Sequence, residues 1–275
     1  MPPEPPEPDP SLLDLIAGRP SEIGLDRAAL ELARIEYPDL DPGEWIARLD
    51  RCASEVAESA HDLSDGKDFI ATMNSYLFGK LGLRGNKDDY YNAANSCLNR
   101  VLETGLGIPI TLSVIYIEVA RRLAMPVRGI GLPGHFIVQY DDGEYSTWID
   151  PFHGGALLDA ERCRTLAQVE SLEPEMLAPV GVRSIVMRMI ANLRHVYFSR
   201  GEAGKALRVM DLLIAANPDS AEEHKQRAVA LLQLNRMTDS LAAFRRYLEL
   251  APHAPDKDAI VDQIRSLAFW IASRN

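Results

Sequence analysis

The stretch that decides the fold runs from Gly107 to Val127 and reads GIPITLSVIYIEVARRLAMPV. Pro109 suits the first position of a helix, because proline has no N–H to satisfy there and its φ angle is already helical. The residues after it are apolar on nearly every side as far as Arg121, which predicts a helix buried on most faces. We therefore expect this segment to form the central helix of a globular domain.

Beyond this helix the apolar period changes from 3.6 to 2, which predicts short strands. The strands are PVRGIG (126–131), HFIVQY (135–140) and EYSTWID (144–150), and Asp142-Gly143 between the last two is a strong hairpin signal. Before the central helix, helical spacing of apolar residues predicts helices within residues 11–63, 68–81 and 90–103. Helices followed by antiparallel strands indicate a helix-rich α+β domain with a small antiparallel sheet.

The hairpin predicts a contact between an imidazole and a carboxylate. If a two- or four-residue loop is centred between Asp142 and Gly143, His135 faces Asp150 across the strands. Opposed β-carbons lie roughly 5 Å apart, so the carboxylate could bond one ring nitrogen and fix the tautomer of His135. The alternative is that His135 is a structural histidine, with its hydrogen bonds made, beside a kink at the start of the strand. The same register pairs Ile137 with Trp148 and Gln139 with Ser146, and it puts Trp148 on the face of His135. The opposite face is expected to turn toward the core, and it carries Phe136, Val138, Tyr145, Thr147 and Ile149.

After residue 181 the sequence is helical again, and it repeats. The dipeptides Asn217-Pro218 and Ala251-Pro252 lie 34 residues apart, and the same offset relates Gly201 to Asn235, where a left-handed turn residue is useful. A helix-turn-helix period of 34 residues is typical of tetratricopeptide repeats. We predict helices near 183–200, 202–216, 219–234 and 237–250, with a last helix near 256–273 that caps the array.

The charge of the chain argues against nucleic acid as a partner. Its 40 acidic and 29 basic side chains leave a net charge of −11, which repels phosphate backbones unless a basic patch overrides it, and the sequence contains no such patch. The chain has no basic-then-apolar leader and no apolar run of membrane-spanning length, so we expect a cytoplasmic protein that does not insert into membranes. Residues 1–10, MPPEPPEPDP, predict an extended disordered tail.

The buried helix, the PGHF stretch before one strand and the IDPF stretch that ends the next resemble the papain-like core of transglutaminase-type proteins. The chain is more closely similar to the SirB family, in which a transglutaminase-like core precedes tetratricopeptide repeats. This resemblance rests on NSCLNRVLETGLGIPITLSVIYIEVARRLAMPVRGIGLPGHF (95–136) and IDPFHGG (149–155), and it covers about residues 11–275. It implies a transglutaminase-like domain over 11–180 and a tetratricopeptide-repeat domain with its capping helix over 181–275.

The resemblance assigns His135 to the histidine and Asp150 to the acid of a catalytic triad. In catalytic members a cysteine sits at the N-terminus of the helix before the strands, where the helix dipole lowers the pKa of its thiol. Here residues 107–113 read GIPITLS, without a thiol. The sequence therefore predicts two members of the triad and no nucleophile at the expected place.

Other residues could stand in for the missing nucleophile. Cys97 lies four residues before Val101 on a predicted helix, which favours a packed core thiol over a displaced nucleophile. Ser113 or Thr111 could be activated by His135, but a hydroxyl lacks the low pKa of a thiol. Cys163 follows the hairpin with no motif around it. The odd number and wide spacing of Cys52, Cys97 and Cys163 favour reduced thiols over disulfides or a zinc site.

We expect no metal ion and no cofactor. His135, Asp150 and His153 could be three metal ligands, with Gly154-Gly155 letting the chain fold back, but a loop role for His153 is favoured. The GIGLPG stretch (129–134) matches the dinucleotide-binding pattern, yet a strand follows it where that pattern needs a helix.

A pocket is expected beside the His135–Asp150 pair. Asn95 and Asn99 either bond the loop backbone around 107–109 or face solvent. The residues expected to line the pocket are Asn95, Asn99, Pro109, Trp148 and Phe152.

These observations predict a non-catalytic or weakly catalytic transglutaminase-like protein that acts as a protein-binding or regulatory module through its pocket and its repeats. The alternative is a hydrolase or acyltransferase in which His135 is the base, Asp150 orients it, and Ser113 or Cys97 attacks. A third possibility is a purely structural scaffold. Two repeats and a cap are few for an independent array, so the repeats either bind a protein partner or dock on the first domain.

Overall fold

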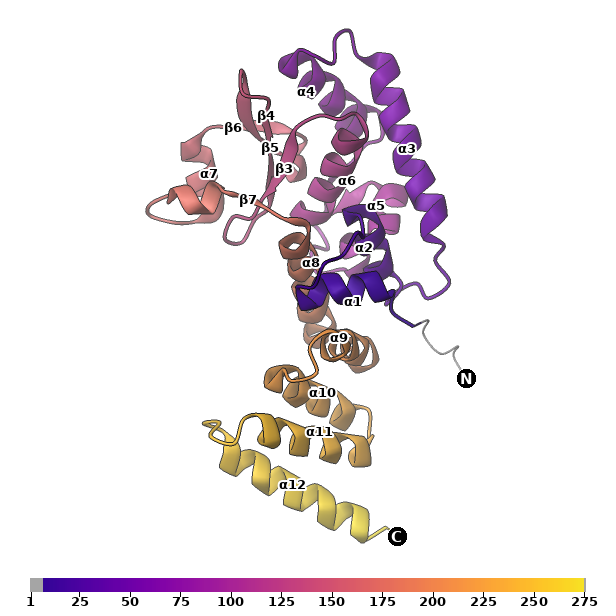
Figure 1. Ribbon diagram of the computed structural model, residues 1–275, viewed down its shortest axis with the longest axis vertical. Coiled ribbons are helices and arrows are strands. Elements are labelled where there is room, and N and C mark those ends of the chain that lie inside the picture. Colours follow the sequence, from indigo (N-terminus) through magenta and orange to yellow (C-terminus); the bar gives the residue numbers. More distant parts are fainter. Residues whose placement is uncertain (1–6, 275) are drawn as a thin grey trace. The chain divides into compact units, whose positions relative to one another are not determined.

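The computed structural model describes residues 7–274, which form two compact units (Figure 1). The first unit contains Glu22–Asn192, and the second contains Glu7–Ser21 together with the chain from Leu193 onward. The tail predicted for residues 1–10 falls partly on residues 1–6, which lie outside the described part. The prediction is wrong at Pro10, because helix α1 (Pro10–Ala17) begins there and the Asp9 carboxylate accepts the N–H of Ser11.

The first unit is rich in helices that begin at an aspartate cap. Asp41 accepts the N–H of Gly43 at the start of α3, and Asp65 accepts those of Lys67 and Asp68 at the start of α4. The helices before the central one are α2 (Leu25–Ala33), α3 (Pro42–Ser59), α4 (Gly66–Asn74), the π-helix η1 (Ser75–Lys80), the 3₁₀-helix η2 (Ala93–Ser96) and α5 (Leu98–Thr104). The single helix predicted for 90–103 is wrong, because the backbone is extended at Cys97 (φ −100°, ψ 114°) and separates η2 from α5.

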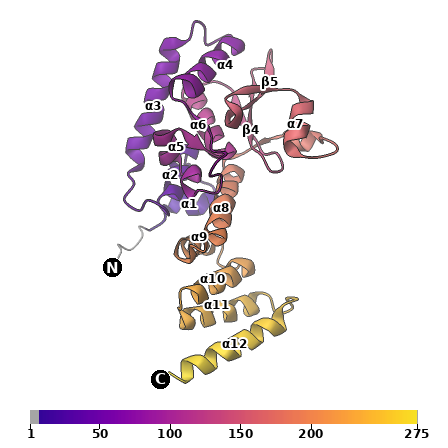
Figure 2. The same ribbon diagram turned by 180° about the vertical axis from the view of Figure 1, so that it is seen from behind.

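The central helix α6 (Pro109–Arg122) is buried almost all round, as its apolar sequence predicts. It packs against α2, α3 and α5 on one side and against strands β3 (Val127–Ile130) and β4 (Ile137–Asp141) on the other (Figures 1 and 2). Burial extends to polar positions: Thr111 and Ser113 are fully inaccessible and Glu118 is 1% exposed.

A charged cluster holds the C-terminal end of α6. The Arg122 guanidinium donates to Asp26 Oδ2 at 2.6 Å, Glu118 Oε2 at 2.7 Å and Asp50 Oδ1 at 2.6 Å. Burial raises the pKa of Glu118, and the Arg122 and Arg121 guanidiniums oppose that rise. Arg122 therefore ties three helices, α2, α3 and α6, through one cation whose side chain is 11% exposed.

Antiparallel strands form a five-stranded sheet in the order β6-β5-β4-β3-β7. Beside β3 and β4 it contains β5 (Ser146–Asp150), β6 (Ala156–Leu158) and β7 (Pro179–Val180), and a separate two-stranded parallel ladder joins β1 (Arg84–Gly85) to β2 (Leu106–Gly107). The register of the hairpin differs by two residues from the prediction: Gln139 faces Trp148 and Asp141 faces Ser146.

The turn explains this difference. The Asp142 carboxylate accepts the N–H groups of Glu144 and Tyr145 and the hydroxyl of Tyr140, so Tyr145 belongs to the turn and not to the strand. A shift of two residues keeps each side chain on its predicted face. Phe136, Val138 and Ile149 are accordingly buried.

The other face of the sheet is also covered. Helix α7 (Ala160–Ala167) places Cys163 and Ala167 in a cluster with Ile137 from β4, and Trp148 packs against it. Two short 3₁₀-helices, η3 (Pro151–His153) and η4 (Pro174–Leu177), complete this part of the chain before helix α8 (Val182–Ser199). The sheet therefore packs against α6 on one face and against the cluster that includes Cys163 and Ala167 of α7 on the other.

The second unit is entirely helical and confirms the predicted repeat architecture. Helices α9 (Ala203–Ala216), α10 (Ala221–Gln233), α11 (Met237–Leu250) and α12 (Lys257–Ala272) pack in chain order, each on the next (Figure 2). Gly201 and Asn235 both have φ near +60°, at 68° and 57°, at the equivalent turns where the 34-residue offset places them. Helix α1 packs against α9 and belongs to this unit.

Among residues 7–274 no helix is both long and apolar enough to cross a bilayer.

Candidate functional site

The carboxylate of Asp150 is fixed by the turn that follows β5. Its Oδ1 accepts the backbone N–H groups of Phe152 at 3.0 Å and His153 at 3.3 Å, which caps η3, and Pro151 occupies the first position of that helix. Asp150 is 1% exposed. One carboxylate oxygen is thus used to hold the carboxylate in place, and Oδ2 is left for other partners.

His135 is one of these partners. Its Nε2 lies 3.0 Å from Asp150 Oδ2, and the histidine is 9% exposed. The predicted contact is therefore present although the predicted opposition is wrong: under the observed register Asp150 falls opposite Ile137, and His135 reaches it diagonally from the turn before β4, where its own N–H bonds Leu132. A diagonal neighbour in an antiparallel pair is within reach of a long side chain.

His153 is the second partner, and sequence reasoning set it aside as a loop residue. Its Nδ1 lies 2.7 Å from the same Asp150 Oδ2, and its ring stacks on that of His135 with centroids 5.9 Å apart. In a 3₁₀-helix residues three apart eclipse each other, which carries His153 back over Asp150. An aspartate before proline with a histidine three residues later is the sequence signal that could have revealed this contact.

The electrostatics of the cluster favour an ionised carboxylate. Burial raises the pKa of Asp150, but the hydrogen bonds and charges of His135 and His153 outweigh it, so the pKa lies below its ordinary value. An ionised carboxylate has no proton to donate, so the ring nitrogens that face Oδ2 supply the N–H of both contacts. His135 Nδ1 makes no hydrogen bond within residues 7–274, so it can accept a proton.

The start of α6 offers no thiol to this base. Pro109 occupies its first position, the Thr111 hydroxyl donates to Asn95 O at 2.8 Å, and the Ser113 hydroxyl lies 3.5 Å from Phe136 O. Both hydroxyls are thus engaged by main-chain carbonyls inside the core.

All three cysteines of the chain are buried. Cys97 is fully buried, and its Sγ lies 3.3 Å from Ala93 O. Cys163 is part of the cluster between the sheet and α7, where burial raises the pKa of its thiol to about 11. Cys52 is buried on α3, and burial also raises the pKa of its thiol. A raised thiol pKa is the opposite of what a nucleophilic cysteine needs.

Aromatic side chains flank His135. Phe152 packs edge-on against the His135 ring at 6.0 Å and against Tyr90 at 6.1 Å, and Tyr90 and Tyr91 are 37% and 56% exposed. A β-carbon on Gly85 would lie 2.5 Å from the Phe152 ring, so glycine is required there. Neither tyrosine had been assigned to the site from the sequence.

Asn95, Asn99 and Trp148 are the other residues that were predicted to line a pocket. The Asn95 amide donates to the carbonyls of Asp89 and Tyr90, so it organises the tyrosine loop, while its own main-chain carbonyl accepts the N–H of Ile108. Asn99 is buried on α5, with an Oδ1 that meets no donor in the described chain. Trp148 lies on the α7 side of the sheet.

Arg188 on α8 holds the backbone beside the cluster. Its Nη2 donates to Leu132 O and to His135 O, both at 2.7 Å, and its guanidinium lies 5.5 Å from the centre of the Phe136 ring. The sequence carries no local signal for this contact, because the partners are separated by more than fifty residues and are main-chain atoms.

The Gly154-Gly155 pair supplies a matched test of the turn that carries His153. Both residues have left-handed φ angles, 70° and 77°, but a β-carbon at Gly154 would meet nothing within 4 Å, whereas one at Gly155 would lie 2.4 Å from Asn74 Oδ1 and 2.6 Å from the Phe78 ring. We expect Gly154→Ala to cost about 1–2 kcal/mol of unfolding free energy and Gly155→Ala about 2–4 kcal/mol.

Urea denaturation of the two variants measures this difference. Gly155→Ala also has to displace Asn74, whose amide donates to the Gly155 carbonyl at 2.9 Å. Equal midpoints for the two variants would show that the close approach of Asn74 has no energetic weight.

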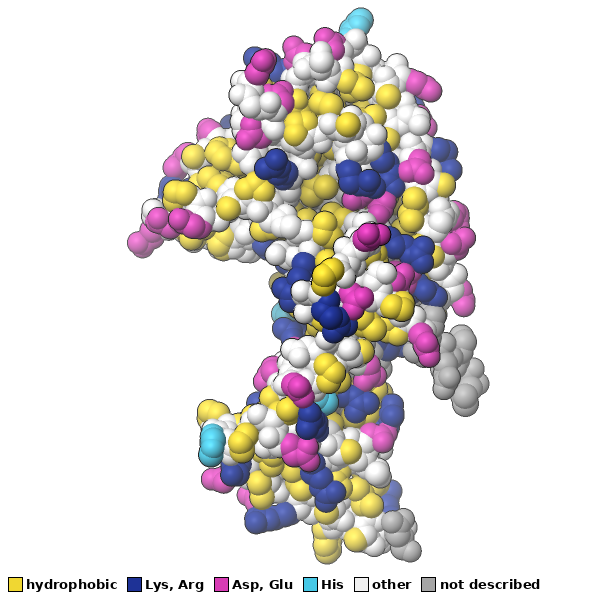
Figure 3. Space-filling model, viewed as in Figure 1, with side chains coloured by type: hydrophobic (Ala, Val, Ile, Leu, Met, Phe, Trp, Pro, Cys, Tyr) yellow, Lys and Arg dark blue, Asp and Glu magenta, His cyan; other side chains and the backbone are white. Residues whose placement is uncertain are grey.

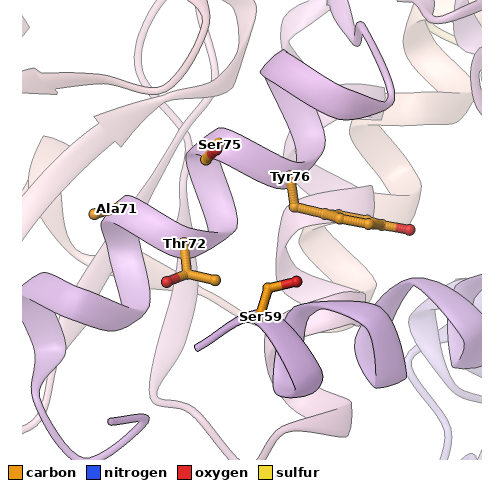
Figure 4. A pocket seen from close by; sticks show the side chains of 5 residues that line it. All are labelled: Ser59, Ala71, Thr72, Ser75 and Tyr76. Carbon is orange, nitrogen blue, oxygen red and sulfur yellow. The ribbon is translucent and has the colours of Figure 1, made fainter. Parts of the chain in front are cut away.

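A pocket of about 300 Å³ lies in the same unit, between the end of α3 and the turn from α4 into η1. Ser59 and Thr72 face each other across it, and Ala71, Ser75 and Tyr76 complete its lining (Figure 4). None of these residues belongs to the His135 cluster. On the face drawn in Figure 3, acidic and basic side chains are interspersed and form no continuous basic band.

Each of the two units contains residues that match a known protein family. The profile of the Transglutaminase-like superfamily matches residues 43–191, and a tetratricopeptide-repeat profile matches residues 193–265. A UPF0162 protein of Xylella fastidiosa is 37% identical over 246 residues, which cover 86% of this chain and 88% of that protein. The chain is a UPF0162-family member of the transglutaminase-like superfamily.

Two further relatives of this UPF0162-family chain extend the comparison. Protein SirB1 of Salmonella typhimurium is 23% identical over 246 residues, covering 87% of this chain and 90% of that protein, which confirms the SirB resemblance. F-box only protein 21 of Homo sapiens is 32% identical over 164 residues, which cover 56% of this chain and 26% of that protein. The UPF0162-family chain thus combines a transglutaminase-like domain with tetratricopeptide repeats, an architecture that suggests protein interaction.

Proposed function

We infer that this chain is a transglutaminase-like protein that has lost acyl-transfer chemistry and acts as a protein-binding or regulatory module. The observation that carries this is an acid-backed imidazole, His135 with Asp150, in a domain whose helix α6 begins with Pro109 and without a thiol. A covalent mechanism needs an attacking atom beside its base and its orienting acid. Without that atom, the pair can accept or donate a proton or bind a ligand, but it forms no acyl-enzyme.

Protein binding is proposed to reside in the repeats over residues 181–275. Support comes from two exposed apolar side chains, Val229 on α10 at 38% exposure and Leu234, which directly follows α10, at 37% exposure. The three free thiols fit the reducing cytoplasm, where we place the protein.

Covalent labelling tests the loss of chemistry. The native full chain is incubated at neutral pH with iodoacetamide or with p-nitrophenyl acetate, and adducts are counted by intact-mass spectrometry. We expect no rapid adduct on the native chain, because all three thiols are buried and the two hydroxyls donate to carbonyls. In denaturant the same iodoacetamide should modify all three cysteines, which shows that the reagent works. A single native adduct that disappears in His135→Ala would overturn the proposal.

The binding role is tested with surface variants. A partner recovered with the full chain should be lost on Val229→Asp or Leu234→Asp and kept on Gln233→Asp, which adds the same charge at an exposed polar position. It should also be kept on His135→Ala. If the partner were lost on His135→Ala and kept on the Val229 and Leu234 variants, the binding role would belong to the His135 cluster and not to the repeats.

The second candidate is a hydrolase or acyltransferase that uses Ser113, with His135 as base and Asp150 as orienter. One observation favours it: the Ser113 hydroxyl lies 3.5 Å from the carbonyl of Phe136, the residue next to His135, and that long contact is weak enough to be exchanged. An acyl adduct mapped to Ser113 that is absent from both Ser113→Ala and His135→Ala would establish this function in place of the first.

A further inference from the structure

Three potential metal ligands converge on one point in the cluster. His135, Asp150 and His153 each offer a nitrogen or oxygen, and these three atoms all lie within 4.8 Å of one another. Two imidazoles and one carboxylate are a donor set that suits zinc and other divalent transition metals, whereas magnesium and calcium prefer oxygen ligands.

The two nitrogen-to-oxygen separations within the cluster are close to those of ligands on one ion. Asp150 Oδ2 lies 3.0 Å from His135 Nε2 and 2.7 Å from His153 Nδ1. Ligands placed about 2.05 Å from a tetrahedral zinc ion lie ~3.4 Å apart. The two contacts therefore need to open by only several tenths of an ångström to admit an ion.

The surroundings orient these ligands before any ion arrives. Two backbone N–H groups hold Asp150 Oδ1, so the carboxylate cannot rotate freely and its Oδ2 points at both rings. Hydrogen bonds to a ligating carboxylate are the usual support of a metal site. Arg188 fixes the main chain of His135.

Access and charge also permit an ion. The side chain of His153 is 40% exposed, which gives an entry route and leaves a coordination position for water. Each neutral imidazole would coordinate through the nitrogen that now faces Asp150 and carry its proton on the other nitrogen, so this tautomer change leaves the charge of the rings unchanged. The carboxylate supplies the negative charge that partly balances the ion.

We propose that His135, Asp150 and His153 form a binding site for one divalent transition metal ion of the zinc type. The site goes beyond the proposed function and does not depend on it, because a binding or regulatory module can hold a metal with or without acyl-transfer chemistry. Its two histidines come from different segments, the turn before β4 and the turn η3, so an ion would join the two turns.

Metal titration of the full chain tests the site. Protein stripped with a chelator and then freed of it is titrated with zinc chloride in competition with a chromophoric zinc indicator. We expect one equivalent to bind per chain, and at least a tenfold weaker affinity in His153→Gln. His61→Gln is the matched control, since His61 is an exposed histidine of the same unit outside the cluster, and it should bind as the unchanged chain does.

Cobalt(II) adds a second readout of the same site. We expect visible absorption bands of a low-symmetry four- or five-coordinate ion, lost in His153→Gln and in His135→Gln. Using two histidine variants keeps the test valid if one of them fails to fold, which circular dichroism reports. Absence of a stoichiometric zinc equivalent, or undiminished zinc binding in the folded histidine variants, overturns the proposal. Either result leaves the labelling test of the proposed function untouched, because that test needs no metal.

Discussion

Replacing Arg122 with alanine is expected to lower the free energy of unfolding by about 3–5 kcal/mol, the largest effect among the substitutions considered. Arg122 is the cation that Glu118 and Asp26 share, and the two carboxylates are 1% and 6% exposed. Removing it leaves both acids desolvated beside each other, and among residues 7–274 Arg121 is the remaining cation in contact with both. Denaturant unfolding followed by circular dichroism measures the change.

Arg121→Ala provides the matched control. Arg121 contacts the same two carboxylates, yet its own side chain is 57% exposed, and water can replace much of what it contributes. We expect a loss below about 1 kcal/mol. If the two variants were equally destabilised, the distinction between a buried and an exposed guanidinium would fail, and the cluster would act as a diffuse network.

Replacing Asp150 with alanine is expected to cost about 2–4 kcal/mol, because it removes the cap of η3 and the partner of two histidines together. The direction in which the pKa of Asp150 is shifted decides how the free energy of unfolding depends on pH. Since the folded pKa of Asp150 is depressed, its contribution is present above the unfolded pKa of about 3.9 and is lost as pH falls through the folded value. Unfolding free energies measured between pH 3 and pH 6 should therefore depend less on pH in Asp150→Asn than in the unchanged chain.

Asp159→Ala is the control for the cap alone. Asp159 caps α7 by accepting the N–H of Arg162 at 2.8 Å, and its side chain contacts no histidine among the described residues. Its loss should cost about 1 kcal/mol. A cost for Asp150→Ala no larger than this would mean that the two imidazole contacts add nothing to stability.

Long-range periodicity made most of the fold predictable from the sequence. The apolar run after Pro109 identifies α6, and the 34-residue offset places α9 to α12 within a few residues of their observed ends. The positions that failed depend on local chemistry that outweighs the period. Pro10 starts a helix because Asp9 caps it, and Tyr145 leaves the strand because Asp142 gathers the N–H groups of the turn.

Contacts of the candidate site could be predicted from the sequence where both residues belong to one hairpin. They could not be predicted where a turn makes the contact or where the partners lie far apart in the sequence. His135 and Asp150 were identified from the predicted hairpin, and their contact survives because a shift of two residues in register preserves their common face. His153 depends on the eclipsed geometry of a 3₁₀-turn. Arg188 binds main-chain carbonyls, which carry no side-chain signature in the sequence.

The pairing of α1 with α9 has a consequence for the order of events during synthesis. Leu12 and Ile16 are buried on α1, yet the helix that contacts α1 begins at Ala203. At ordinary translation speeds, roughly 10–40 s pass on the ribosome between the emergence of the two helices. During that interval α1 has no α9 to pack on, and closing an unfolded stretch of that length would cost on the order of 5 kcal/mol of chain entropy.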